Sequence, residues 1–303
     1  AALLVLPSRI PPKAMEVKLR VRCIDIISGE NKWNDARIIG HFKNGAGKVL
    51  KPEPETPSFA GSTSGWVDKT YVVKVPANSQ MLEFMPCLFN AESGIFDLAL
   101  LQVFPAAAEK LPKLITVPST TIVPANPASL PPELRVAGNR LETKDGKAVW
   151  LQGLCVDSLE WSAGGEKIDK SIPVAIDQWK ANVIRLPVKD NFWCGHGPWQ
   201  KKDGGVEYRK IVDGVVETAA GRGAYVALDL HVFGAPAPEH VEFWKDAAVR
   251  YKNHPAVLFE LFNEPHGISW KTWRDGGEGD VSPGMQALVD AVRSTGARNI
   301  IIA

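Results

Sequence analysis

Residues 257–265 constrain the fold of this chain more than any other stretch, because a nearly apolar run there ends in two polar side chains and a proline. A short apolar run with aromatic and β-branched residues predicts a fully buried strand of a parallel sheet. Asn263 and Glu264 follow at its C-terminal end, where the loops of parallel α/β proteins build the active site. We interpret both as active-site residues and expect Glu264 beside a low-dielectric mouth. A solvated Glu-Pro turn is the alternative.

Apolar strand candidates recur through the second half of the chain and alternate with helical stretches. The strand candidates are residues 151–156, 182–188, 224–231, 257–264 and 299–302. The helical stretches are 211–219, 238–251 and 282–296, the last with Ser282 as its cap and Pro283 in its first turn. This alternation predicts a parallel sheet with right-handed crossovers, either a barrel or an open sheet. The first strand is not followed by a glycine-rich phosphate turn, which argues against a dinucleotide-binding sheet.

The N-terminal third has the period of antiparallel strands. In residues 16–23 the apolar side chains alternate strictly with charged ones, which predicts a half-solvated strand. Further strand-like runs, separated by turn residues, are 36–42, 70–75, 81–88 and 95–104. We therefore predict an antiparallel β-sandwich over residues 1–106.

Prolines recur between the two regions without a helical period. We interpret residues 107–132 as a Pro-rich linker, which is either semi-rigid or an extended strand lying along the next domain. Residues 134–141 and 144–151 then flank an Asp-Gly turn, the signal of a β-hairpin. The α/β domain accordingly spans residues 133–303.

Residues 259–265, Phe-Glu-Leu-Phe-Asn-Glu-Pro, resemble the fourth-strand signature of the family 5 glycoside hydrolases, which are (β/α)₈ barrels of the cellulase and mannanase type. The resemblance covers residues 134–303. It implies a TIM barrel, of which about the first five strands lie in this chain, and it assigns the hairpin to the barrel floor. It also implies that Glu264 is the general acid/base.

The same resemblance assigns substrate contacts to the ends of other strands. Arg185 matches the arginine of the second strand and is expected to stay ionised beside the nucleophile. His231 resembles the third-strand histidine that contacts the substrate, although a buried core histidine is the alternative. Asn263 would hydrogen-bond to the sugar 2-hydroxyl. We include Trp193 among the substrate-binding residues and give Glu260 a structural role inside the barrel.

Retaining hydrolysis requires two carboxyl groups about 5 to 5.5 Å apart, one as acid/base and one as nucleophile. Family 5 enzymes carry the nucleophilic glutamate on the seventh strand, whereas residues 299–302 read as the fifth. We therefore expect the nucleophile outside the 303 residues, and this polypeptide alone to be inactive unless a complementary chain or self-association completes the barrel. The predicted function is retaining hydrolysis of β-1,4-linked polysaccharide by an endoglucanase or mannanase. The alternative is a non-catalytic carbohydrate-binding or structural fragment.

Segments of the predicted sandwich also look like the jelly-roll modules that accompany glycosidases and often bind carbohydrate. Trp33 and Trp66 lie in these segments. Both are candidate sugar platforms, because an exposed indole face can stack on the apolar face of a sugar ring. Tryptophan side chains more often fill a core, so a purely structural module is the alternative.

Composition and motifs argue against several other classes of protein. A formal net charge of +1 gives no field that would attract nucleic acid or an anionic membrane, and no apolar run approaches the roughly 20 residues of a membrane helix. The four cysteines lack the spacing of a zinc site, and we predict neither a metal nor a cofactor. A GxSxG elbow for a serine hydrolase is missing. The resemblance and the polymeric substrate indicate a secreted or periplasmic protein.

Overall fold

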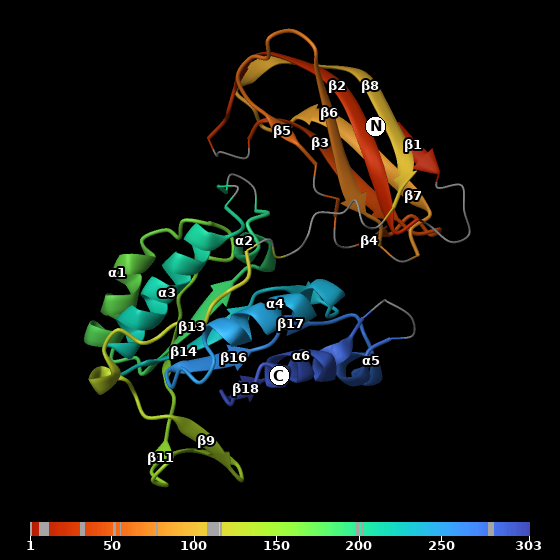
Figure 1. Cartoon of the computed structure of the whole chain (residues 1–303). Helices are drawn as coiled ribbons and strands as arrows, with labels where there is room; N and C mark the ends of the chain where they lie inside the picture. The colour runs from red at the N-terminus through yellow and green to blue at the C-terminus, as the bar shows by residue number, and fades with distance from the viewer. Residues whose placement is uncertain are drawn as a thin grey trace. The chain divides into compact units, whose positions relative to one another are not determined.

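The computed structural model of the chain describes residues 2–5, 12–30, 34–50, 53–54, 56–76, 78–107, 115, 117–197, 200–201, 203–277 and 282–303. The chain divides into two compact units, Ala1–Lys113 and Leu114–Ala303. Figure 1 shows the strands of the first unit and the alternating strands and helices of the second.

The first unit is built from two antiparallel sheets. One has the order β6 (Val67–Lys74), β2 (Ala14–Ile27), β8 (Ser93–Ala106). The other has the order β1 (Ala2–Val5), β7 (Met81–Leu88), β3 (Ala36–Lys43), β4 (Val49–Leu50), with β5 (Ser58–Phe59) paired to β3. The strict alternation of β2 puts Val17, Leu19 and Val21 into one apolar core with Ile38 of β3 and Phe84 of β7. The predicted antiparallel strands of this region are confirmed.

The second unit contains a five-stranded parallel sheet. Its strands follow one another in chain order: β12 (Gly153–Cys155), β13 (Val183–Val188), β14 (Tyr225–Leu230), β16 (Val257–Glu260) and β18 (Ile301–Ile302). The helices are α1 (Ile168–Pro173), α2 (Asp190–Trp193), α3 (Val206–Ala220), α4 (Pro238–Arg250), α5 (Trp270–Asp275) and α6 (Gly284–Ser294). The strand–helix alternation predicted for residues 133–303 is confirmed.

The apolar faces of the longer helices cover the sheet because their sequences have the helical period. Val212 and Val216 of α3, Phe243 and Trp244 of α4, and Leu288 of α6 are fully buried in one core with the parallel strands. Helix α1 was missed by the sequence prediction. It spans only six residues and ends at Pro173, where a π-helical turn (Val174–Gln178) takes over, so it has too few turns to show a helical period.

The hairpin region covers the amino-terminal end of the parallel sheet. Strands β9 (Leu134–Ala137), β10 (Arg140–Thr143) and β11 (Ala148–Val149) form a small antiparallel sheet. Leu134 packs against Tyr225, the first residue of β14, and against Leu258 of β16.

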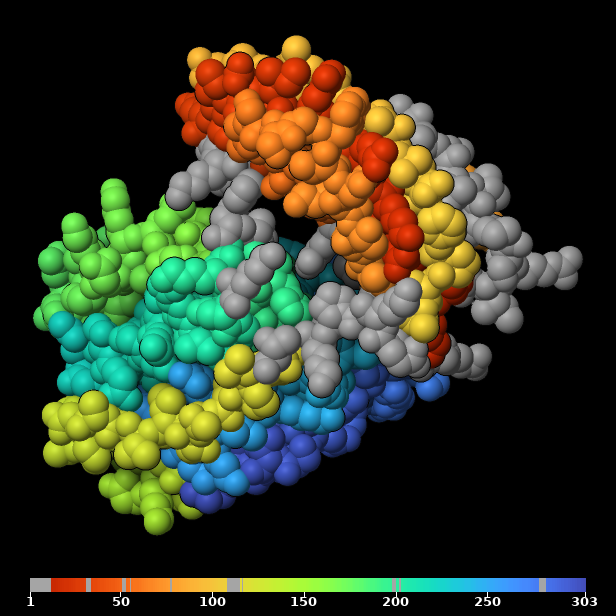
Figure 2. All heavy atoms as spheres, turned by 45° about the horizontal axis from the view of Figure 1, so that its top comes forward, coloured from red at the N-terminus to blue at the C-terminus, as the bar shows by residue number. Residues whose placement is uncertain are grey.

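Residues 117–132, which fall within the predicted linker, form a strap that is part of the second unit and contains a 3₁₀ turn at Pro127–Ser129 (Figure 2). Ser119 donates from its backbone N and from Oγ to the Asp246 carboxylate of α4, each over 2.6 Å. At the far end of the strap, the Tyr225 hydroxyl donates to the carbonyl of Pro132 over 2.7 Å. These contacts hold both ends of the strap against the second unit.

Asp246 is expected to stabilise the second unit strongly, because its buried carboxylate also accepts a 2.7 Å hydrogen bond from Trp193 Nε1. Asp246→Ala leaves three donors unpaired and should lower the free energy of unfolding by about 2 to 4 kcal/mol. Urea unfolding followed by tryptophan fluorescence measures the change. Glu242→Ala, on an exposed position of the same helix, is the control. A loss no larger than that of the control would contradict this role.

Candidate active site

Five polar side chains meet near the carboxyl ends of β13, β14 and β16. Arg185 lies on β13 between the fully buried Ile184 and Leu186. Strand alternation therefore turns its side chain to the opposite face from theirs, toward Glu260 of β16. Asp229 and His231 come from the end of β14, and Asn263 follows β16. The sequence analysis assigned Arg185, His231 and Asn263 to the ends of successive strands, and the structure brings these three into one network.

Arg185 forms the centre of this network. Its Nε and Nη2 donate to the Glu260 carboxylate over 2.9 and 2.7 Å. The same Nη2 lies 2.9 Å from Asn263 Oδ1 and 3.0 Å from Asp229 Oδ2. The hydrogen bonds to Glu260, followed by the charge of Asp229, raise the pKa of Arg185 above its usual value. The guanidinium is therefore a fixed positive charge held in a fork geometry.

Asp229 and His231 form the second part of the network. Asp229 is completely buried, and its Oδ2 lies 2.7 Å from His231 Nδ1. Burial raises the pKa of Asp229 to about 6, against the opposing effects of His231 and Arg185. The His231 side chain is 20% exposed, so the imidazole remains open to a ligand.

The strand predicted over residues 257–264 is interrupted in the structure. β16 ends at Glu260, and the next strand is β17 (Glu264–Pro265), which lies parallel to β15 (Phe233–Gly234). Between them, Leu261 accepts a hydrogen bond from the buried Trp244 indole over 3.0 Å. This break lets consecutive residues depart from strict alternation, so Asn263 and Glu264 need not point to opposite faces of the sheet.

Glu264 is exposed at the start of β17, so the prediction of a low-dielectric surrounding for it is wrong. The reason is the break after β16, because it carries Glu264 beyond the buried part of the sheet onto a short two-stranded edge. Glu260, which the sequence analysis assigned a structural role, has its carboxylate held by Arg185.

Trp193 is not a substrate-binding residue, and that prediction is wrong. Its side chain is fully buried in α2, its indole donates to Asp246, and its ring centroid lies 5.3 Å from that of Phe243. The apolar neighbours of Trp193 place it in the core between the helices.

Of the two tryptophans predicted to be sugar platforms in the first unit, the structure describes only Trp66. Trp33 lies outside the described residues. Trp66 is 45% exposed, and the guanidinium carbon of Arg22 lies 5.0 Å from its ring centroid. One part of the indole is thus covered by a cation while the remainder faces solvent.

The sequence analysis missed two neighbours of the site. Asp229 could have been found from its spacing, since residues two apart on a strand share a face. Phe233 is 53% exposed on β15, opposite Glu264 in register, and its ring meets the His231 ring edge-on at 5.4 Å.

Cys155 also touches the network, through a 3.7 Å contact with Arg185 Nη1. Partial desolvation, followed by the contact with Asp157, raises the pKa of its thiol to about 11, which favours the neutral thiol. All four cysteines, including the buried Cys23, are free thiols.

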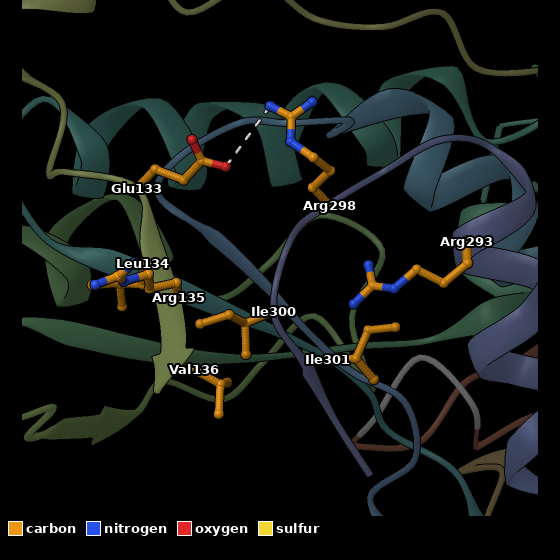
Figure 3. Close-up of a pocket in the computed structure, with 8 residues that line it drawn as sticks. All are labelled: Glu133, Leu134, Arg135, Val136, Arg293, Arg298, Ile300 and Ile301. Carbon is orange, nitrogen blue, oxygen red and sulfur yellow. Dashed lines mark ion pairs between the residues drawn. The ribbon is translucent and has the colours of Figure 1, made fainter. Parts of the chain in front are cut away.

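A hollow of about 400 Å³ lies elsewhere on the second unit (Figure 3). It is lined from β9 by Leu134 and Val136, and from the segment leading into β18 by Arg298 and Ile300. The hollow thus lies on the side of the small antiparallel sheet, away from the charged network around Arg185.

Neither a metal centre nor a membrane span is found in the described part of the chain. No group of three or more His, Cys, Asp or Glu side chains among these residues could hold a metal ion. None of the helices in the same residues is long and apolar enough to cross a membrane.

Comparisons with known proteins point to one family. The model of the cellulase family, glycosyl hydrolase family 5, matches residues 143–303. Endoglucanase A of Butyrivibrio fibrisolvens is 31% identical over 154 residues, which cover 47% of this chain and 34% of that relative. An endoglucanase of Clostridium saccharobutylicum is 27% identical over 198 residues, which cover 62% of this chain and 41% of the relative.

This chain thus spans less than half the length of these two curated relatives. Among solved structures, a β-glucanase from Saccharophagus degradans in complex with cellotetraose superposes with a TM-score of 0.46 at 23% identity, over 62% of this chain and 57% of that one. The family match includes the whole network around Arg185 and excludes the first unit.

Proposed function

The chain belongs to the cellulase family, glycosyl hydrolase family 5, and we propose on this premise that the protein hydrolyses β-1,4-linked glucan with retention at the anomeric carbon. The proposal rests on four side chains that converge at the carboxyl ends of three adjacent strands, beside Glu264. They are Arg185, Asp229, His231 and Asn263. Both relatives described above are named endoglucanases, which favours a glucan over a mannan and internal cleavage.

Glu264 is assigned the role of general acid/base. Its exposed carboxyl can reach the glycosidic oxygen of a bound chain, protonate the leaving group and later take the proton from water. Asn263 is assigned the contact with the sugar 2-hydroxyl. Its Oδ1 is taken by Arg185, whereas its buried Nδ2 has no hydrogen-bond partner among the described residues and is left to donate to a ligand.

We assign Glu260 a positioning role rather than that of nucleophile. Its carboxylate lies in the fork of Arg185, and a nucleophile must instead be free to attack the anomeric carbon. The nucleophilic carboxylate is therefore sought on another strand of the barrel, as the family resemblance implies.

The order of the parallel strands supports a (β/α)₈ barrel over an open sheet. Open doubly wound sheets reverse their strand order at a switch point, where the ligand binds. The described strands β12, β13, β14, β16 and β18 are instead neighbours in chain order. A barrel builds its site from the ends of several strands, which agrees with the origin of the Arg185 network.

The activity is tested with the full-length protein on soluble β-1,4-glucan, with β-1,4-mannan as the competing substrate. Reducing ends should appear on the glucan, with a fall in viscosity that indicates internal cleavage. Proton NMR of the first products should show the β-anomer before mutarotation. No release from either polymer, or an α-anomer first, would overturn the proposal. Because such a polymer cannot enter a cell, we also propose that the protein is secreted or periplasmic.

Trp66 supports a second, binding role for the first unit. Strands β2 and β8 of its sheet lie side by side at the surface (Figure 2), and Arg22 on β2 holds the half-exposed indole in place. We expect Trp66→Ala to weaken retention of the protein on insoluble cellulose about tenfold, because a stacking contact is lost. A depletion isotherm measures this. Trp150→Ala, at an exposed position of the second unit, is the control, and equal retention of both variants would leave the first unit a structural module.

A further inference from the structure

One buried carboxylate connects Arg185 and His231, the two nitrogen-bearing side chains it contacts in the candidate site. Asp229 Oδ2 lies 2.7 Å from His231 Nδ1 and 3.0 Å from Arg185 Nη2. Its side chain is completely buried, and its Oδ1 has no hydrogen-bond partner among the described residues. A buried carboxylate with one orphaned oxygen is costly, so the ion pair with Arg185 and the hydrogen bond with His231 account for its presence at this position.

An ionised carboxylate only accepts hydrogen bonds, so the proton in the contact with His231 must sit on Nδ1. A neutral imidazole that is protonated on Nδ1 carries a lone pair on Nε2. We propose that Asp229 is a positioning residue that fixes this tautomer, so that His231 Nε2 accepts a hydrogen bond from a hydroxyl group of the sugar bound beside Glu264. This inference rests on the proposed function for the identity of the ligand.

The same carboxylate restrains Arg185. Its Nη2 donor is shared between Glu260 Oε1, Asn263 Oδ1 and Asp229 Oδ2, within 2.7 to 3.0 Å. Asp229 therefore acts through Arg185 and His231. It fixes the Asn263 amide, which donates to a sugar hydroxyl, and the His231 imidazole, which accepts from one. Sugar hydroxyls both donate and accept, so a site that offers both kinds of group in fixed positions selects a hydroxylated ligand.

The arrangement also makes sugar binding depend on pH. The charged groups that face Asp229 are Arg185 from β13, Glu260 from β16 and His231 from its own segment. Burial raises the pKa of Asp229 to about 6, so the carboxylate takes up a proton as the pH falls through that value. A protonated Asp229 no longer fixes Nδ1–H, and the affinity for the glucan should fall below pH 6.

Asp229→Asn tests the proposal because an amide keeps the shape of the side chain but can turn its NH₂ toward the ring. In the substrate-free wild-type protein at pH 7.5, nitrogen-15 NMR of the His231 ring should show a proton on Nδ1 and a bare Nε2. In Asp229→Asn the proton should move to Nε2, and kcat/KM on soluble glucan should fall by about 10- to 100-fold, mainly through KM. Asp177→Asn, at an exposed ion pair, is the control.

The fall in affinity below pH 6 should also disappear in Asp229→Asn. A wild-type His231 that is protonated on Nε2, or on both nitrogens, at pH 7.5 would overturn the proposal, and this measurement does not require that the variant folds. An unchanged tautomer in Asp229→Asn would overturn it equally. A wild-type protein with the expected tautomer and no glucanase activity would support the tautomer assignment and contradict only the proposed function.

Discussion

Glu264→Gln is expected to lower turnover of an unactivated β-1,4-glucan by about 100-fold or more, with KM nearly unchanged. Glutamine keeps the size and the hydrogen-bonding oxygen of the side chain but cannot donate a proton to the leaving group. Because Glu264 is exposed on the short strand β17, the substitution should leave the fold intact. The measurement is the initial rate of reducing-end release by the full-length protein.

Two controls separate loss of the acid from other effects. Glu242→Gln, on an exposed position of α4, should retain the wild-type rate. A glycoside with a good leaving group needs little protonation, so Glu264→Gln should lose much less rate in the first step on that substrate. Undiminished turnover of the unactivated glucan by Glu264→Gln would remove Glu264 from the mechanism.

The sequence predicted the strands well where burial alone sets the pattern. Apart from Arg185 and Asp229, residues 183–188 and 225–230 are apolar or aromatic, as expected of strands buried in a parallel sheet. Both runs form strands within a residue or two of their predicted bounds. The alternation of β2 likewise follows directly from having one face in a core. In these segments the local pattern and the packing require the same residues.

The sequence predicted the site less well, because side-chain surroundings depend on contacts between distant segments. Trp193 was predicted to contact the substrate, but its indole donates a hydrogen bond to Asp246, which lies 53 residues away in the sequence. Glu264 looked enclosed because nothing in the local sequence marks the break after Glu260. The spacing to His231 could have predicted that Asp229 lies near the site. Its ion pair with Arg185 could not be predicted, because only the pairing of β13 with β14 brings the two residues together.

Arg185→Lys is expected to reduce kcat/KM on soluble glucan by about 100-fold or more, although the positive charge is kept. Lysine is a point charge without the planar fork, so it cannot bind both oxygens of Glu260 and at the same time reach Asn263 and Asp229. The Asn263 amide and the His231 imidazole would then lose their fixed positions, and misplacement of about 1 Å can cost 100-fold in rate.

The first unit offers a matched control for the same substitution. Arg20 binds Asp68 through Nε and Nη2, each over 2.8 Å, in the same fork geometry but on an exposed sheet face. Arg20→Lys should therefore leave both activity and thermal unfolding almost unchanged, since solvent screens an exposed pair. Arg185→Lys should instead lower the unfolding temperature as well as the rate, because it leaves the completely buried Asp229 and the largely buried Glu260 without their shared partner. If the two variants lost equally little rate and unfolding temperature, the planar fork of Arg185 would not be what positions Asn263 and His231.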